Sequence, residues 1–297
     1  MIMNNIKSKS KREPRPDWLK TTLRRGAEFV EVNRVIRFGR LHTVCEEARC
    51  PNMGECWGHG TATIMILGDV CTRNCRFCAV GPGHPNPLDL NEPDRVVQAI
   101  KDMNLQYAVI TSVTRDDLDD GGADTFARIV EKIRQDIPGC YIELLIPDFN
   151  GSLSALNRVI EARPDVLGHN LETAPRLYPK VRPQADYTRS LNLLASAKKG
   201  GLIVKSGIMV GIGEQPQEVF PIMEDLRELG CDIMTIGQYL QPSRHHFPVD
   251  RYVRPDEFEM YRVKGYKMGF RQMESAPLVR SSYHAERAKK LIESSKS

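Results

Sequence analysis

The stretch ATIMILGDVCTRNCRFC, residues 62–78, joins a short apolar run to three cysteines at the spacing C-x3-C-x2-C. Its first part, ATIMILG at 62–68, is rich in apolar residues and predicts a buried strand. Cys71, Cys75 and Cys78 follow that strand closely. If the strand begins a series of β/α units, these cysteines lie in its first βα loop, at the face where such folds build their active sites.

Five more short apolar runs follow, and stretches of helical length separate them. The runs span residues 107–113, 141–147, 165–172, 202–211 and 232–240. Amphipathic segments at 94–104, 123–137, 153–162, 188–200, 216–230 and 255–269 predict the helices. Six β/α units predict an α/β fold with a parallel sheet. The tight repeat and the lack of a dinucleotide-binding glycine fingerprint favour a partial (β/α)6 TIM-type barrel over an open doubly wound sheet.

The predicted barrel, residues 62–270, is flanked by an N-terminal extension (1–61) and a C-terminal extension (271–297). Residues 1–25 contain eight Lys and Arg against two acids. This arm is either solvated or steers an acidic partner by charge. A basic organellar presequence is the alternative.

Composition places the chain among globular proteins, with 41% hydrophobic and 27% charged residues. No apolar run approaches the roughly 18–20 residues that span a membrane. The net charge of +4 is too small to indicate a nucleic-acid partner. Because the opening lacks the apolar core of a secretory signal, we expect a cytoplasmic protein whose cysteines stay reduced.

A second cysteine triplet, Cys45, Cys50 and Cys56, precedes the first predicted strand at the spacing C-x4-C-x5-C. Disulfides would leave an odd thiol in each triplet, and zinc would need a fourth ligand such as His42 or His59. Packed thiols are a third alternative. An iron–sulfur cluster accounts for both triplets, because thiolates suit its irons and three of them leave one position of a [4Fe–4S] cube open.

The C-x3-C-x2-C motif with Phe77 before its last cysteine resembles the radical S-adenosylmethionine (SAM) superfamily, whose fold is a partial six-unit barrel. The resemblance implies that Cys71, Cys75 and Cys78 hold a [4Fe–4S] cluster whose open iron binds SAM. Cleavage of SAM would then give a 5′-deoxyadenosyl radical, with the protein supplying orientation and exclusion of water.

Further motifs resemble the lipoyl synthase family over all but about the first dozen and last ten residues. They are DWLK (17–20), CPNMGECW (50–57), VTRDDLDDGGA (113–123), HNLET (169–173) and SAPLVRSSYHA (275–285). Ala276 stands where the family often has glycine.

That resemblance implies a second, auxiliary [4Fe–4S] cluster held by Cys45, Cys50, Cys56 and Ser282, with Ser281 the alternative if the alignment slips by one. It further implies insertion of two sulfur atoms, donated by this cluster, at C6 and C8 of an octanoyl-lysyl group. The implied partners are octanoylated lipoyl carrier domains, namely 2-oxoacid dehydrogenase E2 subunits and the glycine cleavage H protein. An electron donor such as ferredoxin or flavodoxin and an iron–sulfur cluster carrier would also be needed.

Five residues are candidates for binding SAM. Asn170 and Glu172 end the fourth predicted strand, and Arg189 could pair with the SAM carboxylate. Arg115 follows the second strand, and Gly211 could let the backbone approach a ligand. Glu172 could instead cap a turn, and Gly211 could simply end its strand.

Other polar and sulfur residues predict structural roles. The aspartates of RDDLDDGG (115–122) favour capping of the following helix over magnesium binding. His169, Cys140 and Cys231 are expected to pack in the interior.

Two other classes of function compete with the one that the resemblance implies. A different radical SAM enzyme could use the second cluster for electron transfer, but such a cluster needs no labile serine ligand. A non-enzymatic carrier of clusters or zinc would need neither SAM nor a barrel.

Overall fold

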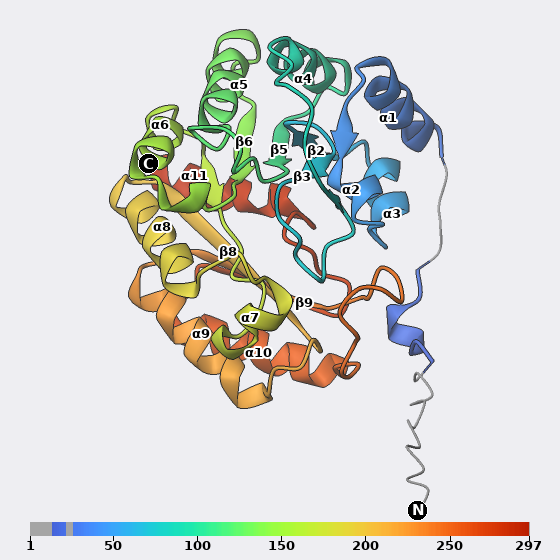
Figure 1. Ribbon diagram of the computed structural model, residues 1–297, viewed down its shortest axis with the longest axis vertical. Coiled ribbons are helices and arrows are strands. Elements are labelled where there is room, and N and C mark those ends of the chain that lie inside the picture. The colour runs from blue at the N-terminus through green and yellow to red at the C-terminus, as the bar shows by residue number, and fades with distance from the viewer. Residues whose placement is uncertain (1–13, 22–25, 297) are drawn as a thin grey trace, which may run out of the picture.

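A parallel sheet runs through the chain and is wrapped by helices (Figure 1). The computed structural model describes residues 14–21 and 26–296. The six predicted strands are β2 (Thr63–Ile66), β5 (Tyr107–Ser112), β6 (Tyr141–Leu145), β7 (Val166–Gly168), β8 (Ile203–Val210) and β9 (Ile233–Gln238). They pair in this order, each parallel to the next, so the predicted parallel α/β architecture is confirmed.

The six predicted helices cover the outer face of the sheet (Figure 1). They are α4 (Glu92–Asp102), α5 (Ala123–Asp136), α6 (Leu153–Glu161), α8 (Tyr187–Lys199), α9 (Pro216–Glu228) and α10 (Pro255–Met268). Several begin at a side-chain cap: Ser152 accepts from the Ala155 N–H, and Asp186 accepts from the Arg189 N–H at 2.6 Å. Gly269 ends α10 in the left-handed conformation, which favours glycine.

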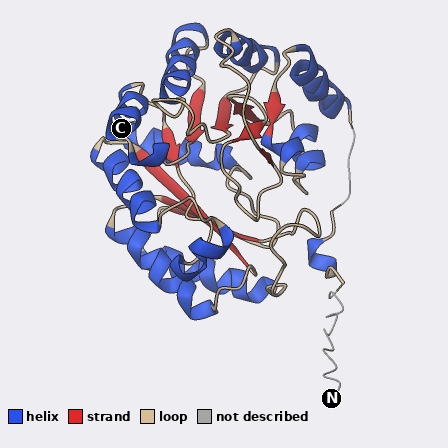
Figure 2. Ribbon diagram, viewed as in Figure 1, coloured by secondary structure: helices blue, strands red, loops and turns tan. Residues whose placement is uncertain are grey.

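The sheet does not close into a full barrel. Its strand order is β1-β2-β5-β6-β7-β8-β9-β10, and within the described residues the two outer strands pair with one neighbour each. Figure 2 shows the strands as an arc inside the helices. The short β1 (His42–Thr43) lies antiparallel to β2, and β10 (Gln272–Ser275) lies parallel to β9. The sequence placed residues 271–297 in a C-terminal extension, and no strand was predicted there.

The C-terminal segment covers the amino ends of the strands. The short helix η4 (Ala285–Ala288) and α11 (Lys289–Lys296) carry four buried apolar residues. Those residues, Ala285, Ala288, Leu291 and Ile292, form a cluster with Tyr107, Val109, Val166, Ile203 and Ile233 of the strands. The opposite end of the sheet, where the βα loops lie, is therefore the end left for a site.

The N-terminal extension packs beside β1 and β2. It contains η1 (Asp17–Leu19), α1 (Ala27–Phe38), α2 (Val44–Glu47) and α3 (Met53–Gly58). Phe29 of α1 and Trp57 of α3 stack with ring centroids 5.1 Å apart, which anchors both helices over the sheet edge. Most of the basic arm at 1–25 lies outside the described residues. No helix within the described ranges is long and apolar enough to cross a membrane.

A buried ion pair lies inside the sheet near the amino ends of its strands. Lys205 Nζ on β8 lies 2.7 Å from Glu143 Oε1 on β6, and both side chains are almost fully buried. The Tyr107 hydroxyl on β5 donates to Glu143 Oε2 at 2.7 Å. Charges in such a place are tolerated when they are paired and hydrogen-bonded, so the three side chains tie β5, β6 and β8 together.

Removing one partner of this pair should destabilise the fold. Lys205→Met leaves the Glu143 carboxylate buried without its cation, and we expect the free energy of unfolding to fall by about 3–5 kcal/mol. Combining it with Glu143→Gln removes both charges and keeps an acceptor for Tyr107. Chemical denaturation should show recovery of part of the loss in the double variant; equal losses in both would contradict the ion-pair argument.

Candidate active site

The first cysteine triplet lies on a loop that closes on itself after β2. Cys71 ends the short strand β3 (Val70–Cys71), which pairs with β4 (Gly81–Pro82), and the Gly83 N–H donates to the Cys71 carbonyl at 2.9 Å. Burial raises the pKa of the Cys75 thiol to about 11 and that of Cys78 to about 12. The charge of Cys71 adds to the shift at Cys75, and the charges of Cys75 and Cys71 add to the shift at Cys78.

The second triplet gathers at α2 and α3. Cys45 lies on α2, Cys56 on α3, and the Cys50 N–H donates to the Cys45 carbonyl at 2.9 Å between them. Burial raises the pKa of Cys45 to about 11 and that of Cys56 to about 12, and the charges of Cys45 and Cys50 add to the shift at Cys56. These three thiols are near enough to influence one another's pKa.

The C-terminal extension reaches the second triplet. The Asn52 side-chain amide donates to the Leu278 carbonyl at 2.7 Å, and the Tyr283 hydroxyl donates to Glu55 at 3.1 Å. The Thr63 hydroxyl, at the start of β2, donates to Ser282 Oγ at 2.8 Å. Residues about 220 positions apart in sequence are thus held side by side.

One cavity of about 1210 Å³ joins the two triplets. Its lining includes all six motif cysteines together with Ser281 and Ser282. Among the described residues, no three His, Cys, Asp or Glu side chains converge tightly enough to hold a single metal ion. The donor set nevertheless fits iron–sulfur clusters, because it offers two groups of three thiols in one cavity and thiolates are the ligands that such clusters take. A bound cluster would displace the thiol protons.

The close approach of the C-terminal segment depends on a glycine in β9. A Cβ added at Gly237 would lie 2.1 Å from the Val279 carbonyl oxygen. This oxygen belongs to the backbone, so it cannot rotate away as a side chain could. Arg280, next to Val279, is half-buried; desolvation lowers its pKa, and the nearby Cys50 opposes that shift. Gly237 therefore sets the distance between β9 and the segment that carries Ser281 and Ser282.

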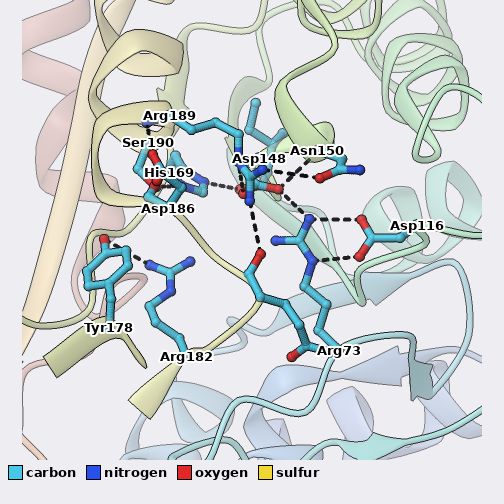
Figure 3. Close-up of polar contacts among 12 residues, drawn as sticks. Arg73, Asp116, Asp148, Asn150, His169, Tyr178, Arg182, Asp186, Arg189 and Ser190 are labelled. Atoms are coloured by element: carbon cyan, nitrogen blue, oxygen red, sulfur yellow. Dashed lines mark hydrogen bonds and ion pairs between the residues drawn. The ribbon is translucent and has the colours of Figure 1, made fainter. Parts of the chain in front are cut away.

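Two of the predicted SAM contacts line the cavity. Asn170 and Glu172 follow β7, and Glu172 has a positive φ of 67°, a strained conformation outside glycine. Burial raises the pKa of the Glu172 carboxyl, and Arg182 opposes the shift. Arg182 also lines the cavity, donates to the Asn170 carbonyl at 2.8 Å, and lies over the Tyr178 ring (Figure 3). Arg182 was not predicted as a site residue, because it follows α7 (Tyr178–Val181) in a stretch with no motif of its own.

The other three predicted SAM contacts, Arg115, Arg189 and Gly211, do not line this cavity. Arg115 pairs with Asp117 at 2.8 Å, and Arg189 pairs with Asp148 at 2.8 Å (Figure 3). Gly211 has a φ of 84°, and a Cβ there would meet the Arg251 carbonyl at 2.4 Å. Local partners thus account for the two arginines, and backbone conformation accounts for the glycine.

The structural roles predicted for other residues are confirmed. Asp120 accepts from the Asp124 N–H in the first turn of α5 at 2.8 Å, which caps that helix. Cys140 and Cys231 are buried. The buried His169 ring lies 2.8 Å from the Ile146 carbonyl and 3.0 Å from Ser190 Oγ.

Comparisons with known proteins agree with this geometry. The model of the radical SAM superfamily matches residues 65–226, and that of the N-terminal domain of lipoyl synthase matches residues 2–50. A lipoyl synthase of Rubrobacter xylanophilus is 56% identical over 92% of this chain and 86% of the relative. One of Chloroflexus aggregans is 51% identical over 96% of this chain and 94% of the relative. The chain belongs to the lipoyl synthase family.

Membership makes the chain a sulfurtransferase that uses radical SAM chemistry, with SAM and a [4Fe–4S] cluster. Lipoyl carrier proteins are the substrates that go with this family. Among solved structures, SuiB of Streptococcus suis bound to S-adenosylmethionine covers 76% of this chain and 54% of its own, at 12% identity and a TM-score of 0.58. Methylornithine synthase (PylB) covers 74% and 73%, at 16% identity and a TM-score of 0.53. These two likenesses confirm the partial barrel of the radical SAM type.

Gly237→Ala should displace the C-terminal segment from the lipoyl synthase cavity. Because the Cβ meets backbone, we expect a loss of about 1–3 kcal/mol in stability and fewer iron atoms bound per chain after reconstitution. Iron analysis and thermal unfolding measure both. Gly81→Ala is the matched control, since a Cβ there has nothing within 4 Å. Wild-type iron content in Gly237→Ala would show that the contact with Val279 is dispensable.

His169 should make stability depend on pH. Burial, followed by the charge of Arg182, lowers its pKa from 6.5 to about 4. Between these values the unfolded chain binds a proton that the folded chain does not, so this contribution to stability falls as pH falls from 6.5 toward 4. His169→Gln removes the imidazole that binds this proton. Unfolding at about pH 7 and about pH 5 should show a smaller stability loss on acidification for the variant than for wild type; equal losses would contradict the assignment.

Proposed function

We propose that this family member binds two [4Fe–4S] clusters in its cavity and uses them to insert sulfur at C6 and C8 of a protein-bound octanoyl-lysyl group. The observation that carries the proposal is the single cavity lined by both cysteine triplets and by the two serines. Cys71, Cys75 and Cys78 would hold the radical SAM cluster. Cys45, Cys50, Cys56 and Ser282 would hold the auxiliary one. When bound, the first supplies the electron that cleaves SAM, and the second supplies the sulfur.

The protein's own residues orient SAM and keep water away. Asn170 and Glu172 line the cavity on the segment after β7, where a carboxylate and an amide suit the amino group and ribose hydroxyls of SAM. Arg182 fixes this segment through the carbonyls of Asn170 and Leu171. Arg115, Arg189 and Gly211 keep the structural roles described above.

Ser282 is the proposed fourth ligand at the second triplet, and Ser281 is the alternative. A hard oxygen ligand on a soft site is weakly held, which suits a cluster that gives up its sulfur. The hydrogen bond from Thr63 shows that the Ser282 hydroxyl has a partner within the protein. Because Ser282 is half-buried and accepts from Thr63, its hydroxyl keeps a hydrogen-bond partner when it is not bound to iron.

The cavity also suits an octanoyl chain. Apolar residues on the inner face of the sheet, among them Met65, Val109, Leu145 and Ile208, line the space shared by the two triplets. Removal of hydrogen from an unactivated carbon is beyond any side-chain base, because the acidity of an alkane lies far outside the range of tuned pKa values. A radical route is therefore required.

The partners follow from this chemistry. Octanoylated E2 subunits and H protein would present the octanoyl-lysyl arm. Ferredoxin or flavodoxin would supply electrons, a cluster carrier would rebuild the auxiliary cluster, and the cytoplasm would supply reducing conditions.

Single substitutions should separate the two triplets. Cys75→Ala should abolish formation of 5′-deoxyadenosine, because it removes a ligand of the SAM-cleaving cluster. Cys50→Ala should retain SAM cleavage but stop sulfur insertion. An anaerobic single turnover with SAM, a reductant and an octanoyl-lysyl peptide, followed by mass spectrometry of peptide and nucleoside, measures both activities. Cys140→Ala, at a buried thiol outside both triplets, is the control.

The same assay tests the alternative in which the auxiliary cluster only transfers electrons. Two sulfur atoms gained by the peptide in wild type, and none in Cys50→Ala, would establish sulfur donation. Full thiolation by Cys50→Ala would overturn the assignment of the second triplet as the sulfur source.

A further inference from the structure

The three residues between Cys71 and Cys75 are each held by a contact with the segment after β5 or with the segment before α8. We call residues 71–78 the cluster loop. The Thr72 N–H donates to the Thr114 carbonyl at 3.0 Å, in the segment after β5. The Arg73 guanidinium donates to both carboxylate oxygens of Asp116, at 2.6 and 2.8 Å. The Asn74 N–H donates to Gln184 Oε1 at 3.0 Å, in the segment before α8.

A buried carboxylate, Asp148, joins two of these anchors. It follows β6, and its side chain is fully buried, at 0% exposed. Arg73 Nη2 lies 2.6 Å from Asp148 Oδ1, and Arg189 Nε lies 2.8 Å from Asp148 Oδ2. Figure 3 shows Asp148 between the two arginines, one from the cluster loop and one from α8.

The contacts form a closed ring. Arg189 Nη2 donates to the Gln184 carbonyl at 2.9 Å, and Gln184 in turn accepts from the Asn74 N–H. The ring runs from Arg73 through Asp148, Arg189 and Gln184 to Asn74, which is bonded to Arg73 in the chain. Both ends of the ring are therefore on adjacent residues of the cluster loop.

Charge makes Asp148 the central member of this ring. Its two oxygens separate the Arg73 and Arg189 guanidinium groups, which would otherwise repel each other in a poorly hydrated place. Arg73 is itself only 5% exposed in its side chain. Its backbone N–H lies 3.4 Å from Cys71 Sγ, so a movement of Arg73 moves a donor to one of the proposed iron ligands. Such partners orient ligands and tune a metal site.

We propose that Asp148 is a positioning residue for SAM cleavage, acting through Arg73 on one side and through Arg189 and Gln184 on the other to fix the cluster loop between Cys71 and Cys75. Asp148 touches neither SAM nor iron in this role. The inference rests on the proposed function in one respect, namely that the cluster loop holds the radical SAM cluster.

The test uses reconstituted enzyme with Asp148→Asn, Arg189→Met and the double variant. Asp148→Asn keeps the shape of the side chain and removes its charge; Arg189→Met breaks the ring at a position that is partly exposed. Three measurements are made: hydrogen exchange of the cluster loop, the electron paramagnetic resonance spectrum of the reduced enzyme with SAM, and kcat/KM for 5′-deoxyadenosine formation without octanoyl substrate.

Asp232→Asn is the matched control. Asp232 is also a buried carboxylate between two cations, with Lys198 at 2.7 Å and Arg271 at 3.7 Å. It precedes β9 at the amino ends of the strands, away from the cluster loop. A general loss of stability would appear in this variant as well, whereas a positioning effect would not.

We expect Asp148→Asn and Arg189→Met each to speed exchange of the Asn74 amide, to alter the spectrum, and to lower kcat/KM about 10- to 100-fold. Because the residues act as one ring, kcat/KM of the double variant should not fall below that of the less active single variant. Asp232→Asn should leave all three readouts at wild-type values.

Wild-type exchange and wild-type kcat/KM in Asp148→Asn would overturn the inference, as would full additivity of the two substitutions or an equal effect of Asp232→Asn. Failure of the proposed function would look different. In that case wild type itself would not cleave SAM, while the hydrogen exchange of the cluster loop would still report whether Asp148 holds it.

Discussion

Parallel pairing of the strands from β2 to β10 is the constraint on which the rest of the structure depends. It places the carboxyl end of every strand at the same edge, so that the loops after β2, β5, β6 and β7 meet although they are far apart in sequence. The sheet stays open between its outer strands, and the N- and C-terminal extensions pack beside that opening. The two cysteine triplets share one cavity for this reason.

Buried charge within this barrel occurs in networks. Lys205, Glu143 and Tyr107 tie three strands together near their amino ends. Asp148, Arg73 and Arg189 tie the cluster loop to the opposite ends. Each network offsets the cost of desolvation with direct hydrogen bonds, and each joins elements that the backbone ladder alone does not connect. The first network supports the fold, whereas the second supports the site.

The cavity is suited to soft metal clusters because its thiols are grouped and shielded from water. Burial raises the pKa of four of these thiols to about 11 or 12, so they are protonated when no metal is bound. The same shielding protects a carbon radical from side reactions, and such protection is a main role of the protein in radical chemistry. Metal binding and catalysis therefore depend on one property of the cavity.

The sequence alone determined the six β/α units, the aspartate cap before α5 and the two cysteine triplets, because each depends on a local pattern of spacing or periodicity. It also carried the motifs that resemble the lipoyl synthase family. Only the tertiary structure decided that Arg189 pairs with Asp148 outside the cavity lining, that residues 272–275 extend the sheet, and that Thr63 meets Ser282. These facts join residues up to 219 positions apart in sequence, and no local pattern encodes which distant partner a buried charge, a short strand or a hydroxyl will find.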